Sequence, residues 1–167
     1  RGGVSDTVWT VISSLGNGGA LWIVLAVILL FFRKTRRAGA AMLAALLIGL
    51  LVGNVLIKPL VMRPRPFVSH PDLTALFIPG DQWSFPSGHT LSSFAAATAL
   101  CFFHHKSGLL ACAAAVLIGF SRLYACVHYP TDVLAGMLLG ILCGLAAGRL
   151  TDRIADRIHT IRLRKGA

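Results

Sequence analysis

The stretch AGAAMLAALLIGLLVGNVLI, residues 38–57, decides the fold of this chain. It carries no charged residue, and its one strongly polar side chain, Asn54, lies near its end. About 20 apolar residues are enough for a helix to cross the hydrocarbon of a bilayer. The stretch therefore predicts a transmembrane helix.

Four further apolar runs lie on either side of this one, at residues 15–32, 90–103, 108–125 and 133–150. The run at 90–103 is short for a membrane span unless its helix begins at residues 87–89. We therefore expect its outer end to be buried in protein rather than exposed to lipid. The run at 133–150 carries glycines at four-residue spacing, which lets one helix face approach a neighbour closely. These glycines are Gly136, Gly140 and Gly144.

The composition agrees with a membrane protein. Only 13% of the residues are charged, whereas about a quarter are charged in a soluble domain. The net charge is +10, but the bases form no stripe interleaved with aromatic residues, which excludes a nucleic-acid-binding surface. The predicted fold is all-α: a polytopic membrane helix bundle with about five transmembrane helices and a short N-terminal amphipathic helix at residues 4–15. One membrane-embedded domain is expected over residues 1–167, with its core motifs at residues 58–132.

The basic residues divide unequally between the two sides of such a bundle. If all five runs cross the membrane, eleven bases lie on one side and five on the other. The first set is Arg33, Lys34, Arg36, Arg37, Lys106, Arg149, Arg153, Arg157, Arg162, Arg164 and Lys165, and the second is Arg1, Lys58, Arg63, Arg65 and Arg122. Because positive charge accumulates in cytoplasmic loops, the first side is predicted to be cytoplasmic. All the bases on the outer side except Arg1 adjoin membrane segments, where ionisable residues are costly and usually functional.

Three short strings of reactive residues fall on that outer side. KPLVMRPRP, residues 58–66, ends the second apolar run, and FPSGH, residues 85–89, opens the third. The third string, residues 121–132, begins with Ser-Arg, contains His128 and Asp132, and bridges the fourth and fifth runs. Each string alone is a weak signal, but three of them on one face are specific.

The three strings provide the parts of an anion site. Lys58, Arg65 and Arg122 supply three cations, so the ligand should carry at least two negative charges. Arginine binds phosphate oxygens through two parallel hydrogen bonds, and lysine adds a point charge. Ser87 and Gly88 precede a predicted helix, where a hydroxyl and free backbone N–H groups bind anions. A side chain at Gly88 would keep the backbone from approaching the ligand.

Two histidines face the same anion in this arrangement. Phosphoryl transfer needs an in-line nucleophile and a proton donor at the leaving oxygen. Asp132 follows His128 by four residues, close to a helix start that Pro130 favours. Its carboxylate can hold one imidazole nitrogen and support the charge that develops on attack, which predicts His128 as the nucleophile. His89 is then the proton donor, and later the group that activates water to hydrolyse a phosphohistidine.

The three strings match the signature of the type 2 phosphatidic acid phosphatase superfamily, K-x6-RP, PSGH and SR-x5-H-x3-D, at every position. The chain therefore resembles that family from Lys58 to Asp132. The resemblance implies a helical bundle and phosphatase chemistry without a metal or other cofactor. It assigns phosphate binding to one group of residues and catalysis to another. The first group is Lys58, Arg65, Ser87, Gly88 and Arg122, and the second is His128, His89 and Asp132.

Within this family we expect hydrolysis of a lipid phosphate at the outer face of a bacterial plasma membrane, on the periplasmic or extracellular side. Undecaprenyl pyrophosphate is the favoured substrate. Phosphatidic acid and phosphatidylglycerol phosphate follow closely, and lipid A phosphate is third. Vanadate-dependent haloperoxidase chemistry, which uses the same anion pocket for vanadate, is disfavoured by the five predicted spans and by the lack of a large soluble domain. A non-catalytic anion-binding or transport module is disfavoured because binding needs no paired acid and nucleophile.

For four residues near the strings, the sequence allows two roles each. Arg63 contacts a distal phosphate or is a solvated loop arginine. Asn54 hydrogen-bonds within the bundle or lines the lipid entry. Trp83 and Phe85 are expected to anchor the outer loop at the membrane interface rather than to bind substrate.

Overall fold

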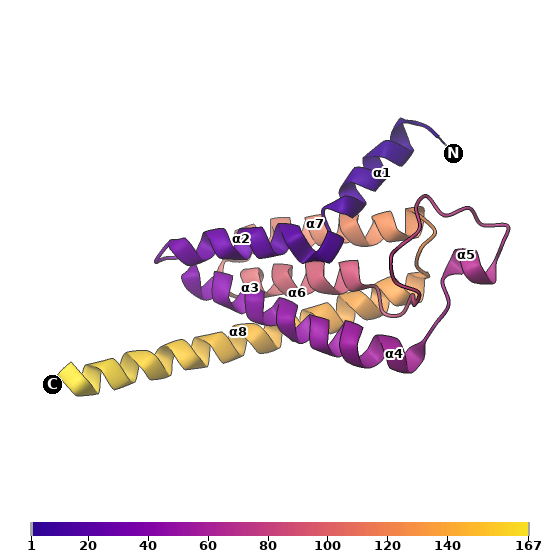
Figure 1. The fold of residues 1–167 in the computed structure, drawn as a ribbon. Helices are drawn as coiled ribbons and strands as arrows, with labels where there is room; N and C mark the ends of the chain where they lie inside the picture. The colour runs from indigo at the N-terminus through magenta and orange to yellow at the C-terminus, as the bar shows by residue number, and fades with distance from the viewer. Residues whose placement is uncertain (1, 167) are drawn as a thin grey trace.

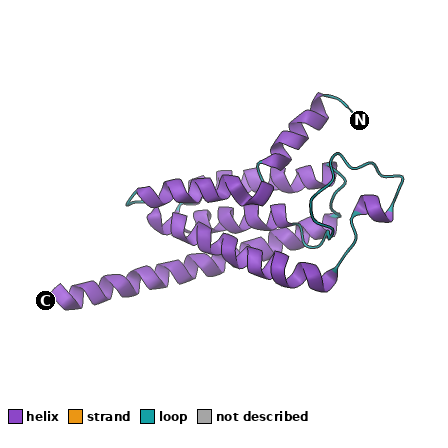
Figure 2. Ribbon diagram, viewed as in Figure 1, coloured by secondary structure: helices purple, strands orange, loops and turns teal. Residues whose placement is uncertain are grey.

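The computed structural model describes residues 2–166, and all regular elements in that range are helices (Figures 1 and 2). The prediction of an all-α bundle is confirmed for these residues. Arg1 lies outside the described residues, as do the side chains of Arg162, Arg164 and Lys165. The elements are α1 Val4–Ser14, η1 Asn17–Gly19, α2 Ala20–Phe31, α3 Arg36–Gly49, η2 Leu50–Ile57, α4 Lys58–Val61, α5 Pro66–Ser69, α6 Gly88–Phe103, α7 His105–Tyr124 and α8 Pro130–Gly166.

Three of the described helices are long and apolar enough to cross a membrane: Arg36–Ser69, His105–Tyr124 and Pro130–Ile161. A fourth crossing results only if α1 and the η1–α2 segment count as one span, bent by 43°. The predicted first span at residues 15–32 is thus interrupted. The break falls at Gly18 and Gly19, whose φ angles of 58° and 69° end a regular helix.

Helix α6 is the centre of the bundle. Its Ala95, Ala96, Ala97 and Ala99 have no exposed surface, and Thr90 at its outer end is equally buried. It packs against α3, α7 and α8. A helix enclosed by protein does not need the length of a lipid-exposed span, which explains why its apolar run is short. The expectation that its outer end is buried is confirmed.

The glycine row of α8 sets the distance between α8 and α6. A Cβ atom added at Gly136 would lie 2.7 Å from the Ser87 carbonyl oxygen, and one at Gly140 would lie 2.6 Å from that of Leu91. At Gly144 the same test gives 2.6 Å to the Thr98 Cβ atom. Any side chain larger than hydrogen would push the helices apart, so the row acts as the predicted packing face.

Helix α1 packs on α7 through polar and aromatic contacts. Tyr124 donates a hydrogen bond to an Asp6 carboxylate oxygen at 2.7 Å, and Trp9 stacks on Phe120 with ring centroids 5.0 Å apart. Asp6 and Ser13 are buried, while Val4, Val8 and Val11 on the apolar face are exposed. The helix is thus amphipathic with its polar side turned toward α7.

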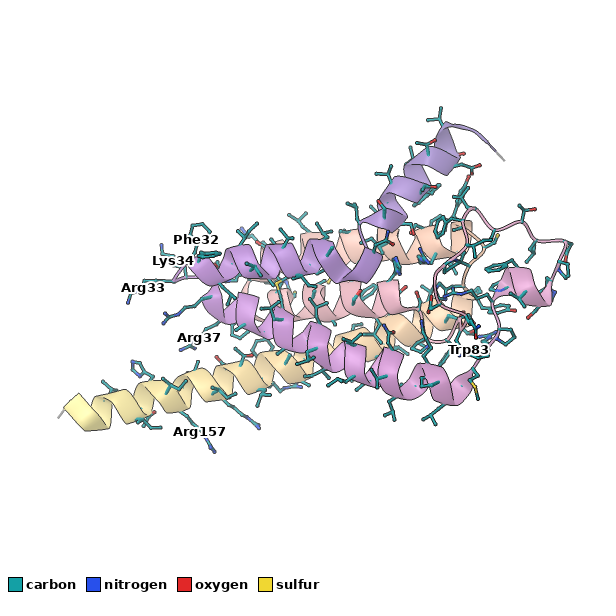
Figure 3. All side chains as sticks on the ribbon, in the orientation of Figure 1. Phe32, Arg33, Lys34, Arg37, Trp83 and Arg157 are labelled. Carbon is teal, nitrogen blue, oxygen red and sulfur yellow. The ribbon has the colours of Figure 1, made fainter. Side chains whose placement is uncertain are left out.

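The two ends of the bundle differ in charge. Figure 3 shows Arg33, Lys34 and Arg37 at one end, Arg157 near the same end on the part of α8 that diverges from the bundle, and Trp83 at the other end. Arg37 contacts Asp152 and Asp156 of α8 at 3.3 and 3.5 Å. The four labelled bases, all of the set predicted to be cytoplasmic, therefore lie toward the same end of the bundle.

The packing of α6 on α8 makes a prediction about stability. Gly140→Ala should lower the stability of the purified protein by about 1–3 kcal/mol, because the added methyl group overlaps the Leu91 carbonyl oxygen. Thermal unfolding in detergent measures the change. Leu142→Ala, at an exposed position of the same helix, is the control and should have a much smaller effect. Equal melting of the Gly140→Ala variant and the unsubstituted protein would contradict this account of the packing.

Candidate active site

The three reactive strings meet at the end of the bundle that carries Trp83, around a cavity of about 900 Å³. One part of its wall is polar and includes Lys58, Arg65, Gly88, His89, Arg122 and His128. The other part is apolar and comes from α2, α3 and η2, with Ile23, Leu43, Leu46, Leu47 and Leu50. The cavity therefore joins a cationic end to an apolar wall. Within the described residues, no three His, Cys, Asp or Glu side chains form a metal-binding cluster.

Asp132 holds the segment that carries His128. It is the third residue of α8, and its Oδ2 atom accepts a hydrogen bond from the backbone N–H of Tyr129 at 2.9 Å, as in one half of a capping box. The same oxygen lies 3.4 Å from Nδ1 of His128, within ion-pair distance but without hydrogen-bond geometry. Contacts between catalytic groups are often long before substrate binds and shorten in the complex.

Arg63 lies on the far side of Asp132. It donates hydrogen bonds to Asp132 Oδ1 at 2.8 Å and to Thr131 Oγ1 at 2.7 Å, and its guanidinium stacks on the Tyr129 ring. It is absent from the cavity wall. Arg63 is thus partly exposed to solvent, as one of its two interpretations expected, but its guanidinium contacts the carboxylate behind His128 and not the cavity.

The environment of His128 favours the neutral imidazole. An Arg65 N–H lies 3.4 Å from His128 Nε2, and since arginine only donates, Nε2 presents its lone pair. The ring proton then sits on Nδ1, facing Asp132. Burial lowers the pKa of His128 to about 4. The charges of Arg65 and Arg122 act in the same direction, and Asp132 opposes them.

Two of the three cations at the site are almost fully buried. Arg65 and Arg122 expose only 2% and 3% of their surface. Arg65 donates to the Val127 carbonyl oxygen at 2.8 Å, and Arg122 to the Ser13 hydroxyl at 2.5 Å. Among the described side chains, only Arg122 Nε and His128 Nδ1 are buried without a hydrogen-bond partner, and both belong to this site. The site thus retains unused hydrogen-bonding capacity.

An aspartate that the sequence analysis did not consider already contacts two of the cations. Asp81, in the loop between α5 and α6, pairs with Lys58 through Oδ2 and with Arg65 through Oδ1, the latter at 2.6 Å. Its backbone carbonyl also accepts a hydrogen bond from Arg65 Nε at 3.0 Å. Burial raises the pKa of Asp81, but Lys58 and Arg65 outweigh that effect and bring it below its ordinary value.

At the start of α6, Gly88 faces the cavity and Ser87 is buried in the protein. Gly88 lines the cavity, and a Cβ atom there would lie 3.2 Å from the Asn54 side-chain oxygen. Ser87 is fully buried; its hydroxyl accepts a hydrogen bond from Thr90 and its backbone N–H donates one to the Asp132 carbonyl oxygen at 3.1 Å. This last bond ties the start of α6 to the start of α8. Asn54 also lines the cavity, which agrees with one of its two interpretations.

The N-terminal segment forms another side of the site. His89 Nε2 lies 2.9 Å from Asn17 Oδ1, and Ser13 receives the hydrogen bond from Arg122. A Cβ atom at Gly16 would lie 2.7 Å from the His89 ring, so the chain passes directly over this histidine. Sequence reasoning missed Ser13 and Asn17, because nothing near them marks a site. The glycines on both sides of Asn17 were the one available sign of a turn.

Comparison with known proteins identifies the family. The sequence model described as the PAP2 superfamily matches residues 37–155. An undecaprenyl-diphosphatase of Sulfolobus acidocaldarius is 36% identical over 121 residues, which are 71% of this chain but 58% of that protein. The crystal structure of Aquifex aeolicus LpxE has a TM-score of 0.76 at 32% identity, covering 88% of this chain and 87% of the other. The crystal structure of a transmembrane PAP2-type phosphatidylglycerolphosphate phosphatase from Bacillus subtilis has a TM-score of 0.74 at 29% identity, over 92% of this chain and 80% of the other. The family resemblance found in the motifs is confirmed.

The surroundings of His128 make a prediction about its titration. Its imidazole should take up a proton near pH 4, whereas an ordinary histidine does so near about 6.5. NMR of the histidine side chains in detergent, with His128→Gln to assign the signal, measures this pKa. Because the unfolded chain binds the proton at higher pH than the folded one, this residue should also lower stability as the pH falls from about 6.5 toward 4. Titration of the assigned signal near pH 6.5 would contradict the burial described.

Proposed function

Because the chain is an integral membrane protein of the PAP2 superfamily, we propose that it hydrolyses a lipid phosphate or pyrophosphate through a phosphohistidine on His128. The observation that carries this proposal is the Nε2 lone pair of His128, turned toward Arg65 at the cationic end of the cavity, with Asp132 behind the ring. The arrangement provides a nucleophile in His128, a carboxylate in Asp132 that supports the positive charge developing on the ring, and an anion site at the cationic end of the cavity.

The proposed reaction has two steps. Nε2 of His128 attacks phosphorus as the bond to the lipid-side oxygen breaks, and His89, as the imidazolium, donates its Nε2 proton to that oxygen and becomes neutral. His89 then takes a proton from water, which attacks phosphorus, breaks the bond to His128 and releases phosphate. Lys58, Arg65 and Arg122 stabilise charge on the equatorial oxygens in both steps. Gly88 contributes backbone N–H groups at the start of α6, and Ser87 supports that helix start.

His89 needs a local rearrangement for this role. Its Nε2 proton faces Asn17 Oδ1 at 2.9 Å. A leaving-group oxygen would take the place of that amide oxygen as hydrogen-bond acceptor. Asn17 therefore keeps a hydrogen on Nε2 of His89, at the atom from which the imidazolium form would donate its proton once the substrate binds.

We favour undecaprenyl pyrophosphate as the substrate. The apolar side of the cavity suits a lipid chain and three cations suit a pyrophosphate. The similarity to the undecaprenyl-diphosphatase of Sulfolobus acidocaldarius agrees with this choice. The alternative is phosphatidic acid or phosphatidylglycerol phosphate, which the similarity to the Bacillus subtilis phosphatidylglycerolphosphate phosphatase supports. Lipid A phosphate and haloperoxidase chemistry rank lower, as they did from the sequence.

The proposed topology has five crossings within one domain over residues 1–167. It treats the bent α1–α2 pair and the buried helix α6 as crossings in addition to the three long apolar helices. The basic end of the bundle then lies in the cytoplasm, and the site opens at the outer face of the plasma membrane. We propose that the reaction requires no metal or other cofactor.

The first test is phosphate release by the purified protein in detergent, with EDTA present. Undecaprenyl pyrophosphate and phosphatidic acid are compared side by side. Release should resist EDTA and should disappear in His128→Ala, and the faster lipid identifies the substrate class. Release that EDTA abolishes would refute the metal-free mechanism, and release that persists in His128→Ala would refute the assigned nucleophile.

Arg63 provides a second test, of the support behind the nucleophile. Arg63→Gln should reduce kcat roughly tenfold or more, because Asp132 loses the partner of its Oδ1 atom. KM should change little, since Arg63 does not line the cavity. Arg33→Gln, at the opposite end of the bundle, is the control. A change confined to KM would mean that Arg63 contacts substrate instead.

A further inference from the structure

The segment Phe77–Asp81 lies across the cationic end of the cavity and is fastened on both sides. On one side, the Leu76 backbone N–H donates to the Ala125 carbonyl oxygen at 3.0 Å. On the other, the Ser84 backbone N–H donates to the Arg63 carbonyl oxygen at 2.8 Å. Between these attachments, Phe77 covers Arg122, with the guanidinium carbon 5.0 Å from the ring centroid. We call residues 77–81 the strap.

Within the strap, Asp81 contacts two of the three cations. Its two carboxylate oxygens go separately to Lys58 and to Arg65, and its backbone carbonyl takes a third donor, Nε of Arg65. Two oxygens of a bound phosphate would accept hydrogen bonds from Lys58 and Arg65 in the same arrangement. Asp81 itself is half-exposed, so solvent and ligands can reach it.

We propose that Asp81 is an internal competitor for the phosphate site and sets a charge threshold for lipid headgroups. For the identity of those lipids, the inference rests on the proposed function. A ligand binds only if it replaces the carboxylate on Lys58 and Arg65. Because Asp81 is tethered beside these cations, its effective concentration is high. A ligand must therefore interact with Lys58 and Arg65 more strongly than the Asp81 carboxylate does.

Phosphate esters differ in what they offer to the cations. A phosphodiester carries one negative charge and two non-bridging oxygens, which is no more than the carboxylate already provides. A terminal phosphate carries up to about two charges and three such oxygens. The free energy needed to displace Asp81 is the same for a phosphodiester and for a terminal phosphate. Only a ligand whose interaction with the cations exceeds this free energy binds, so the displacement acts as a threshold. At the surface of a bilayer it excludes the abundant diester headgroups and leaves the site to terminal phosphates.

The test compares two soluble probes that need no turnover. Inorganic phosphate and dimethyl phosphate are titrated against the thermal midpoint of the full chain in detergent. If the strap leaves the site open for about a tenth of the time, Asp81→Asn should tighten the binding of both probes about tenfold. Dimethyl phosphate should then bind measurably, which it should not do in the unsubstituted protein. Asp72→Asn is the matched control, since Asp72 is an exposed aspartate of the same loop.

A bilayer experiment tests the biological consequence. In vesicles with rising phosphatidylglycerol content, hydrolysis of a lipid phosphate should be inhibited in Asp81→Asn but not in the unsubstituted protein or in Asp72→Asn. Unchanged or weaker phosphate binding by Asp81→Asn would overturn the proposal. A variant that fails to fold even with saturating phosphate would also overturn it, because phosphate should replace the carboxylate. Asp81→Asn could bind phosphate more tightly while neither the unsubstituted protein nor the variants hydrolyse a lipid phosphate. That result would refute the proposed function but support the competition between Asp81 and phosphate.

Discussion

The close approach of α6 and α8 is the constraint on which the site depends. Gly136, Gly140 and Gly144 let the two helices touch at backbone distance, and the Ser87 N–H then reaches the Asp132 carbonyl oxygen at 3.1 Å. Ser87 directly precedes α6 and Asp132 lies in the first turn of α8, so one hydrogen bond fixes the starts of both helices. The starts carry His89 on one side and the support for His128 on the other. Packing in the middle of the bundle thus determines the geometry at its end.

The second constraint is the balance of charge at that end. Arg65 and Arg122 are almost fully buried, and burying a cation without a partner is expensive. Arg65 is satisfied by carbonyl groups and Asp81, while Nε of Arg122 remains unpaired. In the proposed function, a bound phosphate supplies the missing acceptors. In the absence of substrate, the cations that would bind its phosphate are paired with Asp81. The strap thus both stabilises the ligand-free protein and determines which lipid headgroups can bind.

The sequence predicted those features whose signal is local. Long apolar runs located α3, α7 and α8, and motif spacing identified the three strings that the fold brings together. It did not predict the break at Gly18 and Gly19, because two left-handed glycines leave the composition of an apolar run unchanged. Nor did it identify contacts between residues far apart in sequence, such as Asn17 with His89 and Arg63 with Asp132. Asp81 was missed for the same reason, since its loop position carries no periodicity that points to Lys58.

The central claim is that His128 forms a bond to phosphorus during turnover, and rapid quenching tests it most directly. The protein is mixed with a lipid pyrophosphate labelled in its terminal phosphate, quenched in alkali within milliseconds to seconds, digested and analysed by mass spectrometry. The account predicts an acid-labile phosphate on His128 that appears during turnover and is absent from a His128→Gln variant. Phosphate on His89, or turnover with no labelled histidine at any time, would contradict it.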